Sequence, residues 1–143
     1  MTAPIVLKGH VGIGPPVRGL VLAARDNFSA RYDLDRIKGV FSRPGHALHG
    51  QSYVGKVLVL DIAKGGVATA WMLAEMAARE MAPKALVLNA ANPIMAQGAA
   101  FANLSFLDRF ETDVTAAVRS GDEVAVDPAA GMLTILARGS GAG

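Results

Sequence analysis

The order of hydrophobic and polar positions along the chain predicts alternating strands and helices. Two runs of consecutive apolar residues, Lys56–Ile62 and Ala85–Asn89, are typical of strands buried on both faces, as in parallel sheets. Between them the Ala-, Leu- and Met-rich segment Val67–Met81 predicts a helix, which Pro83 ends. These segments predict a strand, a Gly-Gly turn, a helix and a second, parallel strand.

The remaining segments predict short helices and further strands around this unit, antiparallel in the first part of the chain and at its end. Turn-forming residues bound each of them. The expected strands are Ile5–Leu7, Val17–Ala24, Leu104–Leu107 and a hairpin of Glu123–Val126 with Met132–Leu136, and the expected helices are Pro93–Ala102, capped by Asn92, and Thr112–Arg119. The pattern predicts one α/β domain over residues 1–138, with a mixed sheet and a parallel βαβ core, followed by a flexible Gly/Ser tail at residues 139–143.

Composition narrows the class of protein. Hydrophobic residues make up 52% of the 143 positions and charged residues 18%, which excludes a disordered chain or a coiled coil. The absence of cysteine excludes disulfides, a thiolate nucleophile and a Cys-ligated metal within this chain. No apolar run approaches the length of a membrane span and no signal peptide is recognisable, so we expect a soluble cytoplasmic protein without membrane partners.

Charge is spread unevenly along the chain. Residues 1–56 carry 8 basic and 3 acidic side chains, whereas residues 57–143 carry 6 basic and 9 acidic ones. This asymmetry is compatible with a basic face or with an ordinary solvated surface. Basic clusters interleaved with aromatic residues are missing, so we do not expect a nucleic-acid partner.

The turn between the first buried strand and the following helix is the strongest candidate for a binding site. Gly65 and Gly66 allow a ligand close to the backbone, and the N-terminus of the helix at Val67 favours an anion. Lys64 adds a full positive charge and Thr69 a hydroxyl in the first turn. These residues predict a carboxylate or phosphate site; the alternative is that the glycines only make a tight turn. The segment matches no Walker motif.

A second candidate is the polar segment 26–33, which follows a predicted strand. It contains carboxylate, amide, hydroxyl and guanidinium groups, and loops in such a position often carry site residues. Asn27 and Ser29 are the candidate substrate-binding residues here. The alternative is local turn chemistry with Phe28 anchored in the core.

Histidines supply the third candidate. His46 and His49 lie three residues apart in a Pro/Gly-rich loop, and no carboxylate pair completes a ligand set, so we expect no metal site in this chain. A polar or proton-transfer role of His46 stays open.

Several short motifs occur together in a characteristic order. They are Asn27-Phe28-Ser29 with Asp33, Gly-His-Ala-Leu-His-Gly-Gln-Ser at 45–52, Gly-Lys-Val-Leu-Val-Leu at 55–60, Ala-Pro-Lys-Ala at 82–85 and Gly-Asp-Glu-Val-Ala-Val-Asp at 121–127. Over about residues 5–136 the chain resembles the small subunit of the aconitase X-type dehydratases, which include phosphomevalonate dehydratase and cis-3-hydroxy-L-proline dehydratase.

This resemblance implies a fold and a function. The fold is the swivelling β/β/α domain, the mobile domain of aconitase, and the function is that of a hydro-lyase subunit that is inactive alone. The domain closes over a site in a large subunit, whose cysteines hold an iron–sulfur cluster or a metal. The reaction is the dehydration of a hydroxy acid, in which a base removes a proton next to a carboxylate and a Lewis acid helps the hydroxyl leave.

The chain departs from the family at the strand-to-helix turn. The family has Lys-Gly-Ser-Ser-Thr-Gly-Ser there, whereas this sequence has Gly66 and Val67 in place of the adjacent serines. A backbone anion site survives this change, but a serine base or hydroxyl ligand does not. Thr69, two residues further along, and His46 are the candidate catalytic residues.

Three functional readings therefore stand. The chain is the small subunit of an aconitase X-like dehydratase, or a carboxylate- or phosphate-binding module without catalysis, or an interaction domain that serves assembly only.

Overall fold

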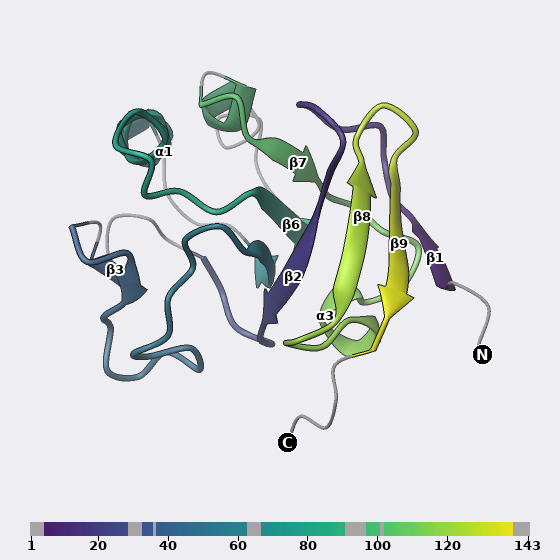
Figure 1. Ribbon diagram of the computed structural model, residues 1–143, viewed down its shortest axis with the longest axis horizontal. Coiled ribbons are helices and arrows are strands. Elements are labelled where there is room, and N and C mark those ends of the chain that lie inside the picture. The colour runs from purple at the N-terminus through teal and green to yellow at the C-terminus, as the bar shows by residue number, and fades with distance from the viewer. Residues whose placement is uncertain are drawn as a thin grey trace.

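A computed structural model describes residues 5–28, 33–35, 37–62, 67–90, 97–100 and 102–138, with the backbone alone for residues 67–70. Figure 1 shows its elements. In chain order they are β1 (Ile5–Lys8), β2 (Val17–Ala23), β3 (Leu34–Asp35), β4 (Val40–Phe41), β5 (Val57–Ile62), α1 (Val67–Ala78), β6 (Ala85–Ala90), β7 (Ser105–Leu107), α3 (Val114–Ala117), β8 (Glu123–Asp127) and β9 (Met132–Ala137).

The predicted βαβ unit is present and forms the centre of the fold. Strands β5 and β6 pair in parallel, with Val59 opposite Val87, and α1 connects them. Strands β2 and β7 extend this parallel sheet on either side. The continuous apolar runs of β5 and β6 are explained by their position, because their first four residues are buried.

Strand β2 joins the parallel sheet to an antiparallel one. Its first half, Val17–Leu20, pairs antiparallel with β8, and its second half, Val21–Ala23, pairs in parallel with β5. The predicted β8–β9 hairpin continues the antiparallel part and β1 ends it, so the strand order is β1-β9-β8-β2-β5-β6-β7. The sheet is therefore mixed, as the sequence predicts.

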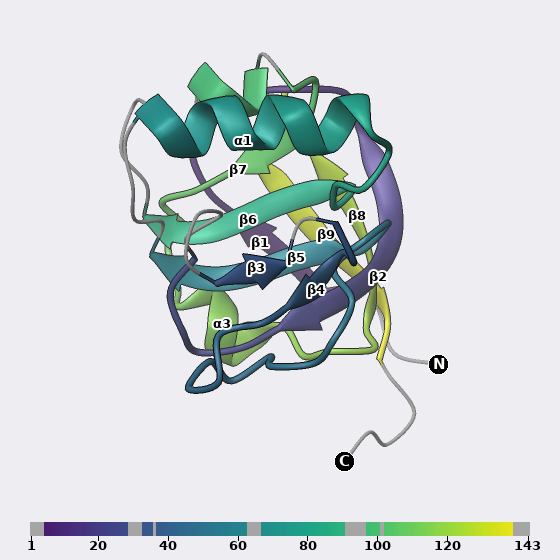
Figure 2. The ribbon, with the colours of Figure 1, turned by 90° about the vertical axis from the view of Figure 1, so that its left-hand side faces the viewer.

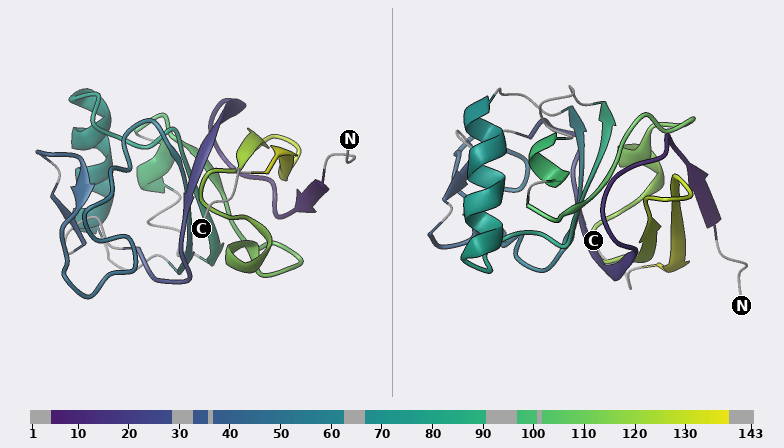
Figure 3. Two further views of the ribbon diagram at one scale, coloured as in Figure 1. Left: turned by 60° about the horizontal axis from the view of Figure 1, so that its bottom comes forward. Right: turned by 90° about the horizontal axis from the view of Figure 1, so that it is seen from above.

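The elements form three layers. Helix α1 and the short β3–β4 pair lie on one side of the parallel strands (Figure 2), and β8, β9 and β1 lie on the other side (Figure 3). This arrangement is a β/β/α architecture.

The chain after β1 joins the two ends of the strand order. The N–H of Ile13 donates to Phe106 O of β7 at 3.1 Å, and the N–H of Phe106 donates back to Ile13 O at 2.8 Å. Gly12 permits this approach, because a Cβ on it would lie 1.9 Å from Phe106 O. The parallel and antiparallel parts thereby enclose a common interior.

Alternation along the strands divides the buried side chains into two cores. The interior core contains valines of the strands, such as Val57, Val59 and Val124. Val114 at the start of α3 and Val118 directly after it belong to the same core. The second core lies under α1 and contains Leu58, Leu60, Leu73, Met76, Leu86, Leu88 and Phe28. Phe28 has no exposed surface, so it is anchored in the core, as one of the two interpretations of the segment 26–33 expects.

Helix α1 is shorter than predicted. It ends at Ala78 rather than at Met81, because Glu80 adopts a left-handed conformation with φ of 58°. The N–H of Met81 then donates to Met76 O at 2.9 Å, which closes the last turn as in a Schellman motif. This backbone geometry, rather than Pro83, therefore ends the helix.

Other boundaries also differ from the sequence prediction. Helix α3 covers four residues of the expected segment 112–119, and residues 97–100 are the described helical part of the expected helix 93–102. The predicted cap at Asn92 and the tail at residues 139–143 lie outside the described residues. None of the helices in the described part of the chain is long and apolar enough to cross a membrane.

Candidate functional site

The carboxyl ends of the parallel strands gather the polar segments that the sequence singles out. The chain leaves β2 and runs beside the end of β5, where the N–H of Asp61 donates to Asp26 O at 2.8 Å and that of Phe28 donates to Ile62 O at 2.9 Å. Asn27 therefore lies next to the last residues of β5, directly before the turn that leads into α1. Crevices at this edge of a parallel sheet commonly bind ligands.

His46 reaches the same place from the loop after β4. Its side chain has no exposed surface, and its Nε2 lies 2.8 Å from Asn27 O. Its Nδ1 lies 3.0 Å from the N–H of Leu48, and its ring stacks on Phe41 with the ring centres 4.6 Å apart. Two candidates from separate parts of the sequence, Asn27 and His46, are thus brought into contact.

Two carboxylates and a guanidinium surround this contact. The carboxylate of Asp26 accepts hydrogen bonds from the N–H groups of Asn27 at 2.7 Å and Ala47 at 3.1 Å. Arg43 donates from Nε to Asp33 at 2.5 Å and lies 3.7 Å from Asp26. Burial of Asp26 by itself raises its pKa, but these hydrogen bonds and the neighbouring His46 and Arg43 side chains together hold the pKa below its ordinary value of 3.8.

A second polar network lies at the same edge of the sheet, beside α3. Asn89 Nδ2 donates to the carboxylates of Asp61 and Asp113, each at 2.8 Å, and its Oδ1 accepts from the N–H of Val114. Hydrogen bonds from the Thr115 side chain and from Asn89, with the nearby Arg25 charge, lower the pKa of Asp113 to about 2. Asp113 also caps the N-terminus of α3.

The remaining predicted site residues are only partly described. Ser29, Lys64, Gly65 and Gly66 lie outside the described residues. Val67 is the first residue of α1 and Thr69 lies in its first turn, as the sequence predicts, and for both the backbone alone is described.

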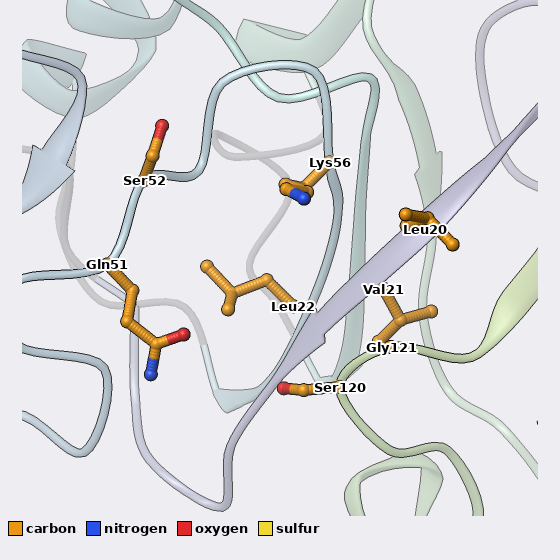
Figure 4. Close-up of a pocket in the computed structure, with 8 residues that line it drawn as sticks. All are labelled: Leu20, Val21, Leu22, Gln51, Ser52, Lys56, Ser120 and Gly121. Carbon is orange, nitrogen blue, oxygen red and sulfur yellow. The ribbon is translucent and has the colours of Figure 1, made fainter. Parts of the chain in front are cut away.

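A surface pocket of about 360 Å³ occurs elsewhere on the chain. Gln51 and Ser52, from the loop before β5, lie on one side of it and Leu20 and Leu22 of β2 on the other, with Lys56 and Ser120 at its ends (Figure 4). Asn27 and His46, the predicted site residues whose side chains the structure describes, do not line this pocket.

Comparison with known proteins agrees with this architecture. The family model described as the aconitase X swivel domain matches residues 6–135. The chain belongs to the aconitase X swivel domain family. The family resemblance seen in the sequence is thereby confirmed, and so is the swivelling β/β/α fold.

Individual relatives match this swivel domain along nearly their whole length. The phosphomevalonate dehydratase small subunit of Methanocella arvoryzae is 30% identical, and the alignment covers 90% of this chain and 98% of that protein. The protein of the same name from Methanosarcina mazei is 31% identical, with 96% of each chain covered. The crystal structure of Thermococcus kodakaraensis aconitase X in its holo form superposes with a TM-score of 0.85 at 27% identity, over 92% of this chain and 98% of that one.

Sequence reasoning missed the network around Asn89 in this swivel domain. A signal for it is present, because each of two continuous apolar runs contains a polar residue near its end, Asp61 in β5 and Asn89 in β6. A polar residue near the carboxyl end of a buried parallel strand points to the edge where ligands bind. The surroundings of His46 were also missed: Asp26 belongs to the candidate segment 26–33 and Arg43 to a predicted turn, but no sequence pattern placed either of them beside His46.

Proposed function

We propose that this chain is the small subunit of a two-subunit aconitase X-like dehydratase that removes water from a hydroxy acid. One observation carries the proposal: the chain corresponds almost end to end to relatives that are small subunits by name, and it covers 98% of one of them. The name of these relatives implies a large subunit as the partner of this chain in catalysis. On this proposal it is inactive by itself.

The substrate anion is assigned to the turn between β5 and α1. Lys64, Gly65, Gly66 and Val67 would bind a carboxylate or phosphate there, because the first N–H groups of a helix have no intrahelical partners and attract anions. The position of the neighbouring segment supports this assignment, since Phe28 donates to Ile62 directly before the turn. Asn27 and Ser29 would complete the binding site from that segment.

The chemistry is the loss of a proton from the carbon next to a carboxylate and of hydroxide from the adjacent carbon. The family serines at this turn are replaced by Gly66 and Val67. Thr69 is therefore the hydroxyl that this chain offers at the turn. The catalytic base comes from Thr69 or from the large subunit, and the swivel domain supplies anion binding and closure over the site.

The ligands for an iron–sulfur cluster or a metal are assigned to the large subunit. This chain contains no cysteine, and its described residues hold no group of three or more His, Cys, Asp or Glu side chains placed to bind a metal ion. The described residues of this chain therefore do not fit such a group.

Co-purification followed by an activity assay tests the proposal. The tagged chain is isolated from its native lysate and the accompanying proteins are identified by mass spectrometry. We expect a cysteine-bearing large subunit in constant stoichiometry, and we expect the complex, unlike the isolated chain, to dehydrate phosphomevalonate or 3-hydroxyproline. A chain that is recovered without a partner contradicts the proposal.

The replaced serines favour a second candidate, a carboxylate- or phosphate-binding module without catalysis. Calorimetry of the isolated chain with phosphomevalonate separates the two. Heat of binding without turnover, even in the presence of a large subunit, supports the module, whereas turnover by the complex supports the dehydratase.

A further inference from the structure

The surroundings of His46 determine which of its ring nitrogens carries the proton. The Leu48 N–H can only donate, so Nδ1, 3.0 Å away, accepts and is unprotonated. The Asn27 carbonyl can only accept, so Nε2, 2.8 Å away, carries the proton and donates. Both nitrogens of a neutral ring are thus engaged by the backbone of this chain.

The ring is also held in place by packing and by charged neighbours. Phe41 stacks on it with an interplanar angle of 25°, and the side chain of His46 has no exposed surface. The carboxylates of Asp26 and Asp33 lie 3.9 and 3.8 Å from Nε2, and Arg43 pairs with both of them. These groups fasten the loop after β4 to the segment after β2.

The fastened segment is part of the proposed substrate site. The carbonyl that His46 holds belongs to Asn27, and the next residue, Phe28, pairs with Ile62 at the end of β5. Movement of this carbonyl would shift the Asn27 side chain relative to the turn between β5 and α1. Such shifts are costly, since a misplacement of about 1 Å can reduce a rate by about 100-fold.

We propose that His46 is a positioning residue rather than a proton-transfer residue. Its Nε2–H holds the Asn27 carbonyl and thereby fixes the segment 26–28 beside the end of β5. The effect of His46 on substrate binding rests on the proposed function, because it assumes that Asn27 contacts the substrate. The hydrogen bond from His46 to the Asn27 carbonyl is present without substrate. The proton-transfer role that the sequence left open would require a ring nitrogen free to face the substrate.

The first test uses the full chain labelled with ¹⁵N, without substrate or partner. At neutral pH we expect the ring spectrum of His46 to show a protonated Nε2 and an unprotonated Nδ1. His46→Leu should shift the amide signals of Phe28 and Ile62, and His46→Gln, which retains an N–H donor, should shift them less. A doubly protonated ring, the opposite tautomer, or unmoved signals in His46→Leu would overturn the inference.

The second test measures kcat and KM of the complex with its large subunit as a function of pH. His46→Leu should raise KM, and His46→Gln should restore most of the loss with an unchanged pH profile, because an amide donates but does not titrate. Loss of general acid–base catalysis instead reduces the rate by about 10²- to 10⁴-fold. A fall in kcat of that size in His46→Gln, with one limb of the pH profile missing, would overturn positioning.

Two controls keep the results separable. His49→Gln changes an exposed histidine in the same loop and should leave all signals of the segment 26–28 and both kinetic constants unchanged. If the wild-type complex turns over none of the hydroxy acids, the proposed function fails, whereas the spectra of the isolated chain still decide whether His46 holds Asn27. If His46→Leu does not fold, His46→Gln decides alone.

Discussion

Asn89 and Asp61 lie near the carboxyl ends of neighbouring parallel strands and share a hydrogen bond of 2.8 Å from Asn89 Nδ2 to Asp61 Oδ1. The same amide group donates to Asp113 and accepts from the N–H of Val114 at the start of α3. One side chain therefore connects β5, β6 and α3 at the edge where the candidate site lies. Removal of the Asn89 side chain should therefore weaken the attachment of all three elements to one another.

Asn89→Ala is expected to reduce the free energy of unfolding by about 2 kcal/mol, because hydrogen bonds to charged groups contribute more than neutral ones and Asp61 would keep its charge without this donor. Urea-induced unfolding of the full chain measures the change. Gln51→Ala is the matched control, since it removes an exposed amide, and it should have little effect. Equal stability of the two variants would show that the network contributes nothing.

Asp113 predicts a dependence of stability on acid pH. Its pKa in the folded chain is lowered from 3.8 to about 2, so the ionised form stabilises the fold above the unfolded value, and this contribution is lost as pH falls toward 2. Asp113→Asn keeps a helix-capping side chain but removes the charge. We expect the variant to be less stable than wild type at neutral pH and the difference to shrink between pH 3.8 and 2. Equilibrium unfolding across that range measures it, and a constant difference would contradict the prediction.

Gly12 lies where the chain after β1 approaches β7, and this approach leaves no room for a side chain on Gly12. A Cβ on it would lie 1.9 Å from Phe106 O, a backbone atom that cannot give way alone. Gly12→Ala should therefore destabilise the chain by about 3 kcal/mol. At Gly45 the nearest atom to an added Cβ is an Arg43 nitrogen at 3.7 Å, so Gly45→Ala serves as the control. Thermal unfolding of both variants is the measurement, and similar melting temperatures would refute the tight approach.

Two bulky residues of α1 should differ sharply in their effect on stability. Met76 is 1% exposed and Trp71 is 72% exposed, although both are large apolar residues of the same helix. We expect Met76→Ala to cost about 2–5 kcal/mol, and Trp71→Ala to stay within about 0.5 kcal/mol of wild type. Chemical denaturation of the isolated chain distinguishes the two. A large loss in Trp71→Ala would mean that its side chain packs in solution.

The central part of the fold is predictable because its sequence signals are local. Continuous apolar runs give β5 and β6, and the turn residues Asp127, Pro128 and Gly131 give the β8–β9 hairpin. The change of partner within β2 and the contact of Ile13 with Phe106 depend on distant segments, and no local pattern encodes them. Helix α1 ends early for a similar reason, since a left-handed Glu80 is not a residue type that sequence rules expect there.

The candidate site was predictable as residues but not as an arrangement. Asn27 and His46 were both identified from loop composition, yet they are 19 residues apart and meet where Asp26 and Arg43 also join the two loops. Their contact also changes the interpretation of His46, since its two nitrogens are engaged by backbone groups. Residue type suggested proton transfer, whereas the geometry favours positioning.

Among the substitutions proposed here, Lys64→Ala should have the clearest effect on activity. If its ammonium group binds the substrate anion at the turn before α1, Lys64→Ala removes a charge-assisted hydrogen bond and should raise KM of the complex by about 10- to 100-fold. Assembly with the large subunit and the melting temperature should not change. Lys38→Ala, which removes an exposed lysine elsewhere, is the matched control. Steady-state kinetics with both variants decides, because an unchanged KM in Lys64→Ala would move the anion site away from this turn, whereas failed assembly would assign Lys64 to the subunit interface instead.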